Sequence, residues 1–514
     1  TPHGDAEATF AALIAAAVGP RTLGLPLGEQ LLHVAGAACA GVRPDLVLLA
    51  TTKADCDAWC DGLVARDPSG IGGPGAVARD LGRALGAPAF TVSAACASGP
   101  AAIGVAARRI ALGHARRVLV VGGDRVGAFV RDGFACLRAL SPTRCAPFDA
   151  TRDGLMLGET AAAILLVADD GGPGARLSGW GARMDANHLT GPSRDGRGLR
   201  EACAQALARG GDQRTSLIVA HGTGTRYNDD AESLAYAALA PHAPVTGFKG
   251  LLGHSLGACG VTEAALALTI RRHARAPGVV GLQQVGTAGA ISVLTPGGHA
   301  VAPGAILLAN AGFGGIDAAT VIGDEPARPL RERASDVGVR VVIDAAGWHR
   351  REGDDERHGS WSEPANDDGM PRLTAREVLG RVEATWGRMD TACRALVALG
   401  HLAGDLPEDS AVVLVSERGC AASDRAFEIA RRGGQADPQR FPYTLPSTAV
   451  GEASIRLRLR GAGLALVGAD DAQARDAARD LISEGAPAVL LARVEADAAP
   501  LLAWAEVWRP RPAI

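Results

Sequence analysis

The segment TVSAACASG (91–99) joins a short apolar run to a cysteine and several small residues. Its first residues predict a buried strand, and the Ala-rich run Pro100 to Leu112 that follows predicts a helix. Cys96 therefore stands at a strand-to-helix turn, where unpaired backbone N–H groups and the positive end of the helix favour the thiolate. Gly99 permits a sharp turn and the close approach of a ligand. The segment has the features of a nucleophile elbow carrying cysteine, and a buried, inert cysteine is the competing interpretation.

Similar short apolar runs recur along the chain and alternate with Ala-rich segments of helical length. This alternation predicts an α/β fold whose strands are buried on both faces. Aromatic residues make up 4% of the chain and 67 residues are Gly, so the predicted core is built from small and aliphatic side chains. The predicted strands run from Asp45 to Ala50, Arg117 to Gly122, Ala161 to Val167, Ser216 to Ala220 and Ala305 to Ala309.

The composition argues against several classes of partner. A formal net charge of −4 gives no reason to expect nucleic acid or an anionic membrane. No apolar run reaches the roughly 18 residues needed to span a bilayer, and acidic rather than basic residues precede the apolar stretch Phe10 to Val18. Ten cysteines without CxxC pairs indicate reduced thiols and a cytoplasmic protein. Cys56 and Cys60 lie one helical turn apart without a second ligand pair, so no metal site is expected.

The length of 514 residues predicts more than one domain, and the absence of an initial Met leads us to expect a trimmed N-terminus. A boundary is visible in EPARPLRERAS (325–335), which combines two prolines with dense charge. A strand is predicted from Val337 to Asp344, and the polar stretch Arg350 to Asp368 is predicted to be a loop or a partly disordered insert. We therefore expect domains at 1–325 and 337–514, joined by a linker at 326–336.

The second domain repeats features of the first. DLVLLATTKAD (45–55) and the segment 76–96 resemble DSAVVLVSERG (409–419) and the segment 449–469. When the two copies are aligned on the glycines that close their last helices, Cys96 falls opposite Gly468. This pattern predicts a duplicated half-fold whose second copy has lost the nucleophile. Chance similarity between two Ala-rich βαβ units is the alternative.

Two further motifs carry histidines. HGTGT (221–225) follows a predicted strand, so His221 lies at a strand's C-terminal end, where open α/β sheets place their sites. A helix is predicted to open at YNDDAE (227–232), with Asn228 or Asp229 as its cap. FKGLLGHSLGACG (248–260) places Lys249 and His254 on either side of a Gly-containing turn. Two neutral imidazoles could donate hydrogen bonds to a developing oxyanion, although each histidine alone could equally be structural.

A fourth motif, NAGFGGIDAA (310–319), follows an apolar strand and surrounds Phe313 with Gly312, Gly314 and Gly315. Glycines at this density suit a tight turn that presents a backbone N–H to an oxyanion. No GxGxxG or P-loop pattern supports nucleotide binding.

In this order, the four motifs resemble those of the β-ketoacyl synthases of fatty-acid and polyketide synthesis. The resemblance covers roughly residues 40 to 325 and extends to GFACLRALS (133–141), PFDATRDGLMLGE (147–159) and DANHLTGP (185–192). It implies a thiolase-like, layered α-β-α-β-α fold, here followed by a second, truncated thiolase-like half.

The resemblance also implies a role for each motif residue. Cys96 would accept the acyl group, and His221 and His254 would stabilise the enolate formed when a malonyl unit loses carbon dioxide. The N–H groups of Cys96 and Phe313 would form the oxyanion hole, with Phe313 gating access. Support would come from Lys249, Glu232, Gly312 and Gly314. The family needs no metal or cofactor, because its substrates are carried on the phosphopantetheine of acyl carrier protein.

The sequence departs from the family pattern at three places. Only 95 residues precede Cys96, whereas the family usually has a longer lead. Ala311 replaces the usual aromatic before the glycine loop, and Asp317 replaces an Asn that often follows it. These departures affect the expected pocket shape and N-terminal packing rather than the reaction class.

The segment from about Val337 onward is similar to the short chain-length-factor subunits that accompany aryl-polyene ketosynthases, on the strength of residues 431–461. In this family two protomers pair through the strand leading to the nucleophile. We therefore predict that Ala465 to Gly468 lies antiparallel to Thr91 to Ala94, giving an internal pseudo-dimer that covers two sheet edges. The alternative is a C-terminal domain that packs elsewhere, and further association of chains is left open.

The predicted reaction is a decarboxylative Claisen condensation with ping-pong turnover between acyl carrier proteins. A degradative thiolase would need a second cysteine in the late Gly-rich loop, where this chain has Phe313. Starter-unit synthases pair one His with an Asn, but His254 occupies that second position. A non-catalytic partner of another ketosynthase would lack Cys96.

Overall fold

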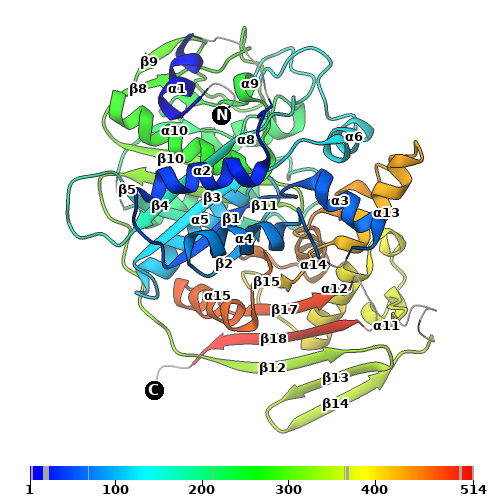
Figure 1. Cartoon of the computed structure of the whole chain (residues 1–514). Helices are drawn as coiled ribbons and strands as arrows, with labels where there is room; N and C mark the ends of the chain where they lie inside the picture. The colour runs from blue at the N-terminus through cyan, green and yellow to red at the C-terminus, as the bar shows by residue number, and fades with distance from the viewer. Residues whose placement is uncertain are drawn as a thin grey trace.

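The computed structural model describes residues 1, 4–15, 22–67, 69–211, 213–363, 365, 370–496 and 501–511. The chain up to β11 (Ile316–Gly323) forms the upper part of Figure 1, and most of the chain after it forms the lower part. We call these parts the first half (residues 1–323) and the second half (residues 335–511). Residues 324–334, which overlap the predicted linker, contain neither helix nor strand.

The first half contributes four strands to an eleven-stranded sheet. The order is β2-β1-β3-β4, with β2, β1 and β3 parallel and β4 antiparallel to β3. The first three strands are almost entirely buried, which agrees with their continuous apolar sequences. The bounds are β1 (Leu46–Ala50), β2 (Ala89–Ser93), β3 (Arg117–Gly123) and β4 (Ala161–Val167).

A second sheet of five strands lies behind the first, in the order β5-β11-β10-β6-β7. This sheet brings together the ends of the strands that precede the two histidine-bearing motifs and the glycine-rich motif. The bounds of its other strands are β5 (Arg176–Met184), β6 (Thr215–Val219), β7 (Val245–Thr246) and β10 (Ala305–Gly312), and the short strands β8 (Arg275–Pro277) and β9 (Gly298–Ala300) pair separately.

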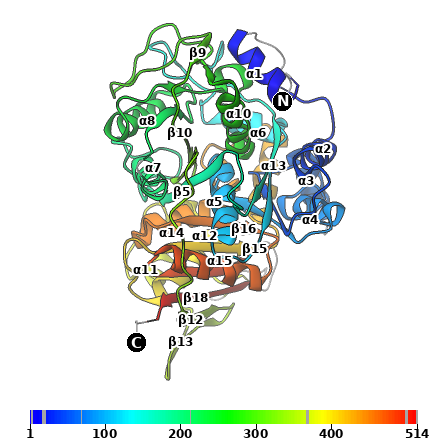
Figure 2. The same cartoon turned by 90° about the vertical axis from the view of Figure 1, so that its left-hand side faces the viewer.

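Two buried helices, α5 (Ser98–Ala111) and α10 (Cys259–His273), pack between these sheets and contact both. Helices α2 (Leu27–Cys39) and α4 (Pro74–Leu85) cover the outer face of the first sheet, while α7 (Arg197–Arg209) covers the second (Figure 2). The predicted α-β-α-β-α layering is therefore confirmed. Within the described residues, every helix is too short or too polar to cross a membrane.

Other helices of the first half lie at its edges. Helix α1 packs against α10, and α3 and α6 contact each other near the second half. Helix α8 packs on α7, while α9 is a single turn. Their bounds are α1 (Ala6–Ala15), α3 (Cys56–Ala65), α6 (Ala128–Cys136), α8 (Arg226–Leu239) and α9 (Lys249–Leu252).

The second half repeats the first sheet's topology. Its strands run in the order β16-β15-β17-β18, with three parallel strands and an antiparallel fourth, as in β2-β1-β3-β4. This agrees with the predicted duplicated half-fold. The bounds are β12 (Ser335–Ile343), β15 (Ala411–Ser416), β16 (Gly463–Val467), β17 (Val489–Glu495), β18 (Leu502–Pro510), α11 (Ala375–Leu379), α12 (Thr391–Ala403), α13 (Ala421–Arg432), α14 (Thr448–Leu457) and α15 (Asp471–Glu484).

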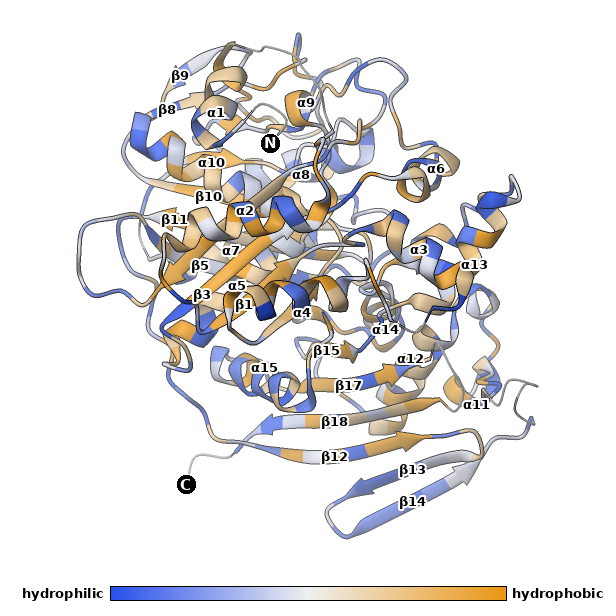
Figure 3. Cartoon of the chain, in the orientation of Figure 1, coloured by the Kyte–Doolittle hydropathy of each residue, from blue (hydrophilic) through white to orange (hydrophobic). Residues whose placement is uncertain are grey.

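The prediction of a loop at 350–368 is wrong for most of that stretch. β13 (Gly347–Glu352) and β14 (Asp355–Ser360) form a hairpin at the edge of the large sheet, and Gly353 turns the chain with φ 58°. Its charged, exposed side chains give no apolar alternation, so the backbone ladder rather than burial defines the strands (Figure 3). Residues 364 and 366–368 of the predicted loop lie outside the described residues.

The two halves meet at a central strand pair. β16 runs antiparallel to β2, with Ala465 opposite Ser93 and Val467 opposite Thr91. The predicted antiparallel pairing of these segments is present. Its register is shifted by one residue, because the predicted ranges place Ala465 opposite Ala94. Both strands are buried, and the pairing turns the two four-stranded units into one continuous sheet. Arg108 and Arg209 reinforce the join through ion pairs of 2.8 and 2.9 Å with Glu484.

Candidate active site

Cys96 lies in a tight turn between β2 and α5 and is 7% exposed. The preceding residue, Ala95, has φ 50°, a left-handed conformation that is strained for a residue with a Cβ. Ser98 locks the turn, because its Oγ accepts from the Ala94 N–H at 2.9 Å and donates to the Ala95 carbonyl at 2.6 Å. The predicted cysteine elbow is therefore present.

Gly99 has a different role from the predicted one. A Cβ at this position would lie 2.7 Å from the Cα of Gly260. Gly99 therefore allows α5 to contact α10, and the close approach it permits is between two helices rather than to a ligand.

The structure brings Cys96 together with His221 and His254. The Sγ atom and one nitrogen from each ring all lie within 4.8 Å of one another. The two imidazole rings are 5.2 Å apart between centroids and nearly perpendicular, at 86°. All three residues are buried. His221 and His254 lie 125 and 158 residues after Cys96 in the sequence. The fold thus brings three separate motifs into one cluster.

His221 follows β6 and is 2% exposed. Its Nδ1 lies 3.0 Å from Asn310 Nδ2. Burial lowers the pKa of His221 well below its ordinary value, and Lys249 and His254 lower it further. His221 is therefore a neutral imidazole at neutral pH.

His254 lies between α9 and the short 3-10 turn Leu256–Ala258. The backbone N–H of Leu256 donates to His254 Nδ1 at 3.0 Å. A neutral ring that accepts at Nδ1 carries its hydrogen on Nε2. This hydrogen-bond pattern differs from that of a metal-ligating histidine, which usually donates from its second nitrogen. The donor set therefore favours oxyanion binding over metal ligation.

Lys249 forms a buried ion pair with Glu263 of α10, with 2.7 Å between Nζ and Oε1. Burial alone would lower the pKa of Lys249, but Cys259 and Glu263 together outweigh that effect and raise it. Lys249 thus reaches His221 through Glu263 and Asn310 rather than by a direct hydrogen bond among the described residues. Sequence analysis missed Glu263, although a single acid in the apolar helix 259–270 needs a buried partner.

Glu232 holds the loop that carries His221. It accepts from the Gly222 N–H at 2.8 Å and from the Tyr236 hydroxyl at 2.9 Å, and it also bonds Asn228. Burial, reinforced by Asp229, raises the pKa of Glu232 to about 8. This position agrees with the supporting role that the resemblance implies.

The predicted helix cap at Asn228 or Asp229 is wrong. Helix α8 begins earlier, at Arg226, and Thr225 occupies the cap position without a side-chain bond. Asp229 instead accepts from the N–H groups of Phe148 at 2.8 Å and Thr223 at 3.0 Å. Its carboxylate organises the neighbouring loops and leaves the helix end uncapped.

The glycine-rich loop packs against both the elbow and the second half. A Cβ at Gly312 would collide with the carbonyl oxygen of Ala94. Gly314 has φ 90°, and its N–H donates to the Leu189 carbonyl at 2.6 Å. A Cβ at Gly451 of α14 would lie 2.6 Å from the Cα of Gly314. These contacts explain why the loop needs glycine at positions 312 and 314. The oxyanion role of the Phe313 N–H stays a prediction.

Two of the three departures from the family pattern, Ala311 and Asp317, are neighbours in the structure. They are cross-strand partners on β10 and β11. Burial raises the pKa of Asp317 well above its ordinary value, and Asp185 and Glu232 raise it further. The shift favours the protonated form of Asp317, which avoids an uncompensated charge behind the glycine loop.

A small cavity of about 20 Å³ adjoins Cys96. Both halves form its wall. The residues that line it include Phe129, Val130, Phe134, Phe313 and Lys53 from the first half, with Phe441, Thr444 and Leu445 from the second. The site next to the nucleophile is therefore incomplete without the second half.

Sequence analysis also missed Lys53, whose ammonium lies on the border between the halves. It forms an ion pair with Asp424 of α13 and lies 3.3 Å from Cys420 Sγ. Lys53 and Asp424 are 3% and 2% exposed. The Phe129 ring lies 5.6 Å from the same ammonium.

Asp124 fixes the loop that carries Lys53. It accepts from the Lys53 N–H at 2.8 Å and, through its other oxygen, from the Gly257 N–H at 2.8 Å. Gly257 follows His254 in the chain, so one buried carboxylate anchors both the Lys53 loop and the turn after a histidine of the cluster.

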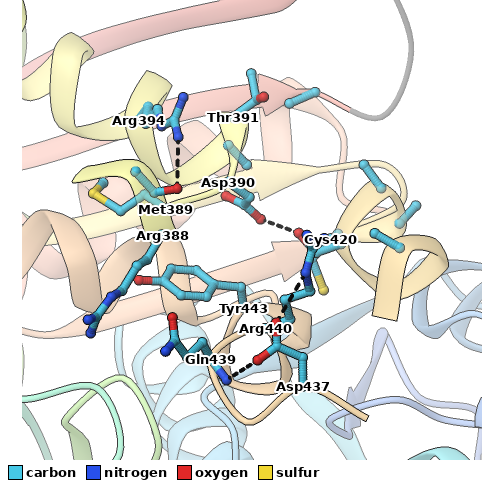
Figure 4. A pocket seen from close by; sticks show the side chains of 18 residues that line it. Arg388, Met389, Asp390, Thr391, Arg394, Cys420, Asp437, Gln439, Arg440 and Tyr443 are labelled. Atoms are coloured by element: carbon cyan, nitrogen blue, oxygen red, sulfur yellow. Dashed lines mark hydrogen bonds and ion pairs between the residues drawn. The ribbon is translucent and has the colours of Figure 1, made fainter. Parts of the chain in front are cut away.

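A larger cavity, of about 420 Å³, lies elsewhere, in the second half (Figure 4). It is found at the N-terminal ends of α12 and α13, and Asp390, Cys420, Tyr443, Arg388, Arg394 and Arg440 line it. Cys96 and the histidines do not line it, so cavity size does not identify the site. The convergence of Cys96, His221 and His254 does.

Two family matches cover more than half of the chain. Residues 7–170 match the N-terminal domain of β-ketoacyl synthases, and residues 174–283 match the C-terminal domain. The matched region contains Cys96, both histidines and Lys249.

Curated relatives share parts of the same region. A Streptomyces coelicolor protein named as actinorhodin polyketide β-ketoacyl synthase 1 is 33% identical over 288 residues, 51% of this chain and 60% of that protein. A mitochondrial Schizosaccharomyces pombe protein named as a 3-oxoacyl-[acyl-carrier-protein] synthase is 35% identical over 198 residues, 34% of this chain and 46% of that protein. The chain thus spans about half the length of these relatives.

Solved structures extend the likeness to the second half. The PfaC keto synthase–chain length factor superposes with a TM-score of 0.77 at 14% identity, covering 99% of this chain and 77% of that one, which shows a shared fold. The ketosynthase ApeO, solved with its chain length factor ApeC from Xenorhabdus doucetiae, is 28% identical with a TM-score of 0.51, covering 60% of this chain and 86% of that one.

Proposed function

Because this chain belongs to the β-ketoacyl synthase family, we propose that it catalyses decarboxylative Claisen condensation through a thioester on Cys96. The observation that carries the proposal is the buried cluster of Cys96, His221 and His254, whose reactive atoms lie within 4.8 Å of one another. The reaction needs one nucleophile and two oxyanion donors at a single carbonyl, and this cluster supplies all three.

In the first step, Cys96 Sγ attacks the carbonyl carbon of an acyl thioester presented by acyl carrier protein. The carbon–sulfur bond to the phosphopantetheine breaks, and the leaving thiol takes the proton from Cys96. The tetrahedral oxyanion would be held by the N–H groups of Cys96 and Phe313. Small residues around the elbow, such as Ala94 and Gly312, let these two backbone segments approach each other.

In the second step, malonyl-carrier protein loses carbon dioxide, and the electron pair of the broken bond forms a thioester enolate. The Nε2–H groups of His221 and His254 would donate to the enolate oxygen. The enolate carbon then attacks the acyl group on Cys96, which releases the free thiolate and a β-ketoacyl-carrier protein. Neutral imidazoles suit this role, because they donate hydrogen bonds without giving up a full proton.

For the second half, we propose a chain-length-factor-like role in an internal pseudo-dimer. The whole-chain fold likeness, the β16–β2 pairing and the shared cavity wall support this. Ala469 precedes the N-cap of α15 as Cys96 precedes that of α5, so Ala469 takes the place of the nucleophile in this copy, one residue from the Gly468 that the sequence alignment implies. The resemblance of residues 431–461 to the chain-length-factor subunits of aryl-polyene ketosynthases adds an aryl-polyene type of product to this proposal. The ten cysteines, which form no disulfide among the described residues, support a reducing, cytoplasmic compartment.

Intact-protein mass spectrometry tests the proposal. We expect the wild type to gain the mass of an acyl group after mixing with acyl-carrier proteins of several chain lengths, and Cys96→Ala to gain none. Cys203→Ala, which removes a buried thiol far from the elbow in sequence, serves as the matched control and should load normally. Absence of loading with every donor would favour a non-catalytic partner of another ketosynthase, and loading from acyl-CoA alone would favour a thiolase.

A further inference from the structure

Asn310 lies in the middle of a buried hydrogen-bond chain that joins His221 to Lys249. Its Nδ2 lies 3.0 Å from His221 Nδ1 and 2.9 Å from Glu263 Oε2. The other oxygen of Glu263 accepts from Lys249 Nζ at 2.7 Å. All four residues are at most 2% exposed. Neither Asn310 nor Glu263 has a role in the sequence-based assignment.

The ion pair fixes which way the Asn310 amide points. Glu263 is paired with a buried ammonium, so its carboxylate can only accept hydrogen bonds. The amide nitrogen of Asn310, and not its oxygen, must therefore face Glu263. The same nitrogen faces His221, so Nδ1 of that ring is an acceptor. A neutral ring with an acceptor at Nδ1 carries its hydrogen on Nε2.

The packing of Asn310 is not explained by stability. Its Oδ1 accepts no hydrogen bond among the described residues and is fully buried. Leaving such an acceptor unpaired costs about 1–3 kcal/mol. Gly260 makes room for this oxygen, since a Cβ there would lie 2.9 Å from it. An apolar side chain of similar size would avoid the cost, so the amide is retained for its N–H groups.

We propose that Asn310 is a positioning residue for decarboxylation, which holds His221 in the tautomer that carries hydrogen on Nε2. His221 then can only donate to the enolate oxygen. The inference rests on the proposed condensing function. It adds Asn310, a residue to which the sequence motifs assign no role. His254 obtains the same tautomer from the backbone N–H of Leu256, which no side-chain substitution removes. His221 is therefore the ring whose tautomer can be changed.

The first measurement is the ring ¹⁵N spectrum of protein labelled at histidine nitrogens, with the His221 signals assigned by their absence in His221→Gln. At neutral pH we expect Nε2 protonated and Nδ1 unprotonated in the wild type. In Asn310→Asp, a carboxylate faces Nδ1 and should draw the hydrogen to it, which reverses the pattern. A wild-type ring protonated at Nδ1, or an unchanged ring in Asn310→Asp, would overturn the proposal.

The second measurement separates the half-reactions. Loss of one oxyanion donor lowers a rate by about 100-fold or more, so Asn310→Asp should slow carbon dioxide release from malonyl-carrier protein by about that factor. Acyl loading of Cys96 should change only slightly, which also shows that the variant is folded. Asn310→Leu adds no acceptor and should lose less decarboxylation than Asn310→Asp. Equal losses in both half-reactions, or a greater loss in the leucine variant, would indicate a purely structural role.

Failure of this proposal is distinguishable from failure of the proposed function. A wild type that neither loads Cys96 nor releases carbon dioxide contradicts the condensing function. The wild-type ring spectrum still decides the tautomer in that case, and also if Asn310→Asp does not fold.

Discussion

Lys53 of the first half and Asp424 of the second half form an ion pair that is buried at the border between the two halves. Trp59 Nε1 donates to the other oxygen of Asp424 at 2.9 Å, so the carboxylate has partners on both sides. The pair adjoins the cavity next to Cys96. One interaction therefore links the packing of the halves to the site.

Breaking this pair is expected to destabilise the protein. Lys53→Met leaves Asp424 buried without its cation, which typically costs about 3–5 kcal/mol. The double variant Lys53→Met, Asp424→Leu has no unpaired buried charge. It should therefore be less destabilised than Lys53→Met alone. Urea unfolding midpoints measure the difference. Additive losses in the double variant would show that the two residues do not interact.

The helix contact at Gly99 can be tested with a control on the same helix. Gly99→Ala places a Cβ 2.7 Å from Gly260 Cα and should destabilise the protein by about 1–3 kcal/mol, as overpacking does. At Gly104 a Cβ would meet Trp180 at an ordinary 3.6 Å. Gly104→Ala should therefore be neutral or stabilising, because Ala is the better helix former. Similar thermal midpoints for the two variants would contradict the account of α5 and α10.

The β16–β2 junction should control the nucleophile, because β2 leads directly to Cys96. Leu466→Asp buries an unpaired charge in β16 and should lower both the unfolding midpoint and the acyl loading of Cys96. Leu502→Asp is the matched control, since Leu502 is 51% exposed on β18. Normal loading and stability in Leu466→Asp would mean that the junction does not support the site.

His221 should make stability depend on pH in a defined direction. Its pKa is lowered in the folded protein, so the unfolded chain binds an extra proton below the ordinary histidine pKa of about 6.5. The contribution of the neutral ring to the free energy of unfolding is present above that pH. It is lost as the pH falls through that value, by up to about 1.4 kcal/mol per pH unit. His221→Gln should lose stability less steeply below pH 6.5. Parallel curves for the two proteins would contradict a neutral, buried His221.

The residues of the four motifs were predictable because each motif is recognisable from a short stretch of sequence. Cys96 and His221 follow strands with clear apolar runs, whereas His254 follows the single helical turn α9. The β16–β2 pairing was predicted from the family resemblance, in which two protomers pair through the strand leading to the nucleophile. The hairpin at β13 and β14 was not, because its strands are charged on both faces and bury little.

Partners of the motif residues were not predictable. Asn310 and Glu263 are 47 residues apart, and Lys53 and Asp424 are 371 apart. Nothing local marks such pairs, since their pairing depends on how α10, β10 and α13 pack. A buried acid or base in an apolar segment signals that a partner exists, but only the fold identifies it.

The most direct test of the account combines both substrates with the purified chain alone. Acyl-carrier protein and malonyl-carrier protein are mixed with the enzyme, and the carrier-bound products are read by mass spectrometry. The account predicts a β-ketoacyl-carrier protein together with carbon dioxide in the wild type, and no β-ketoacyl product from Cys96→Ala. No β-ketoacyl product from a wild-type chain that has loaded its acyl group would contradict the proposal that this chain catalyses the condensation.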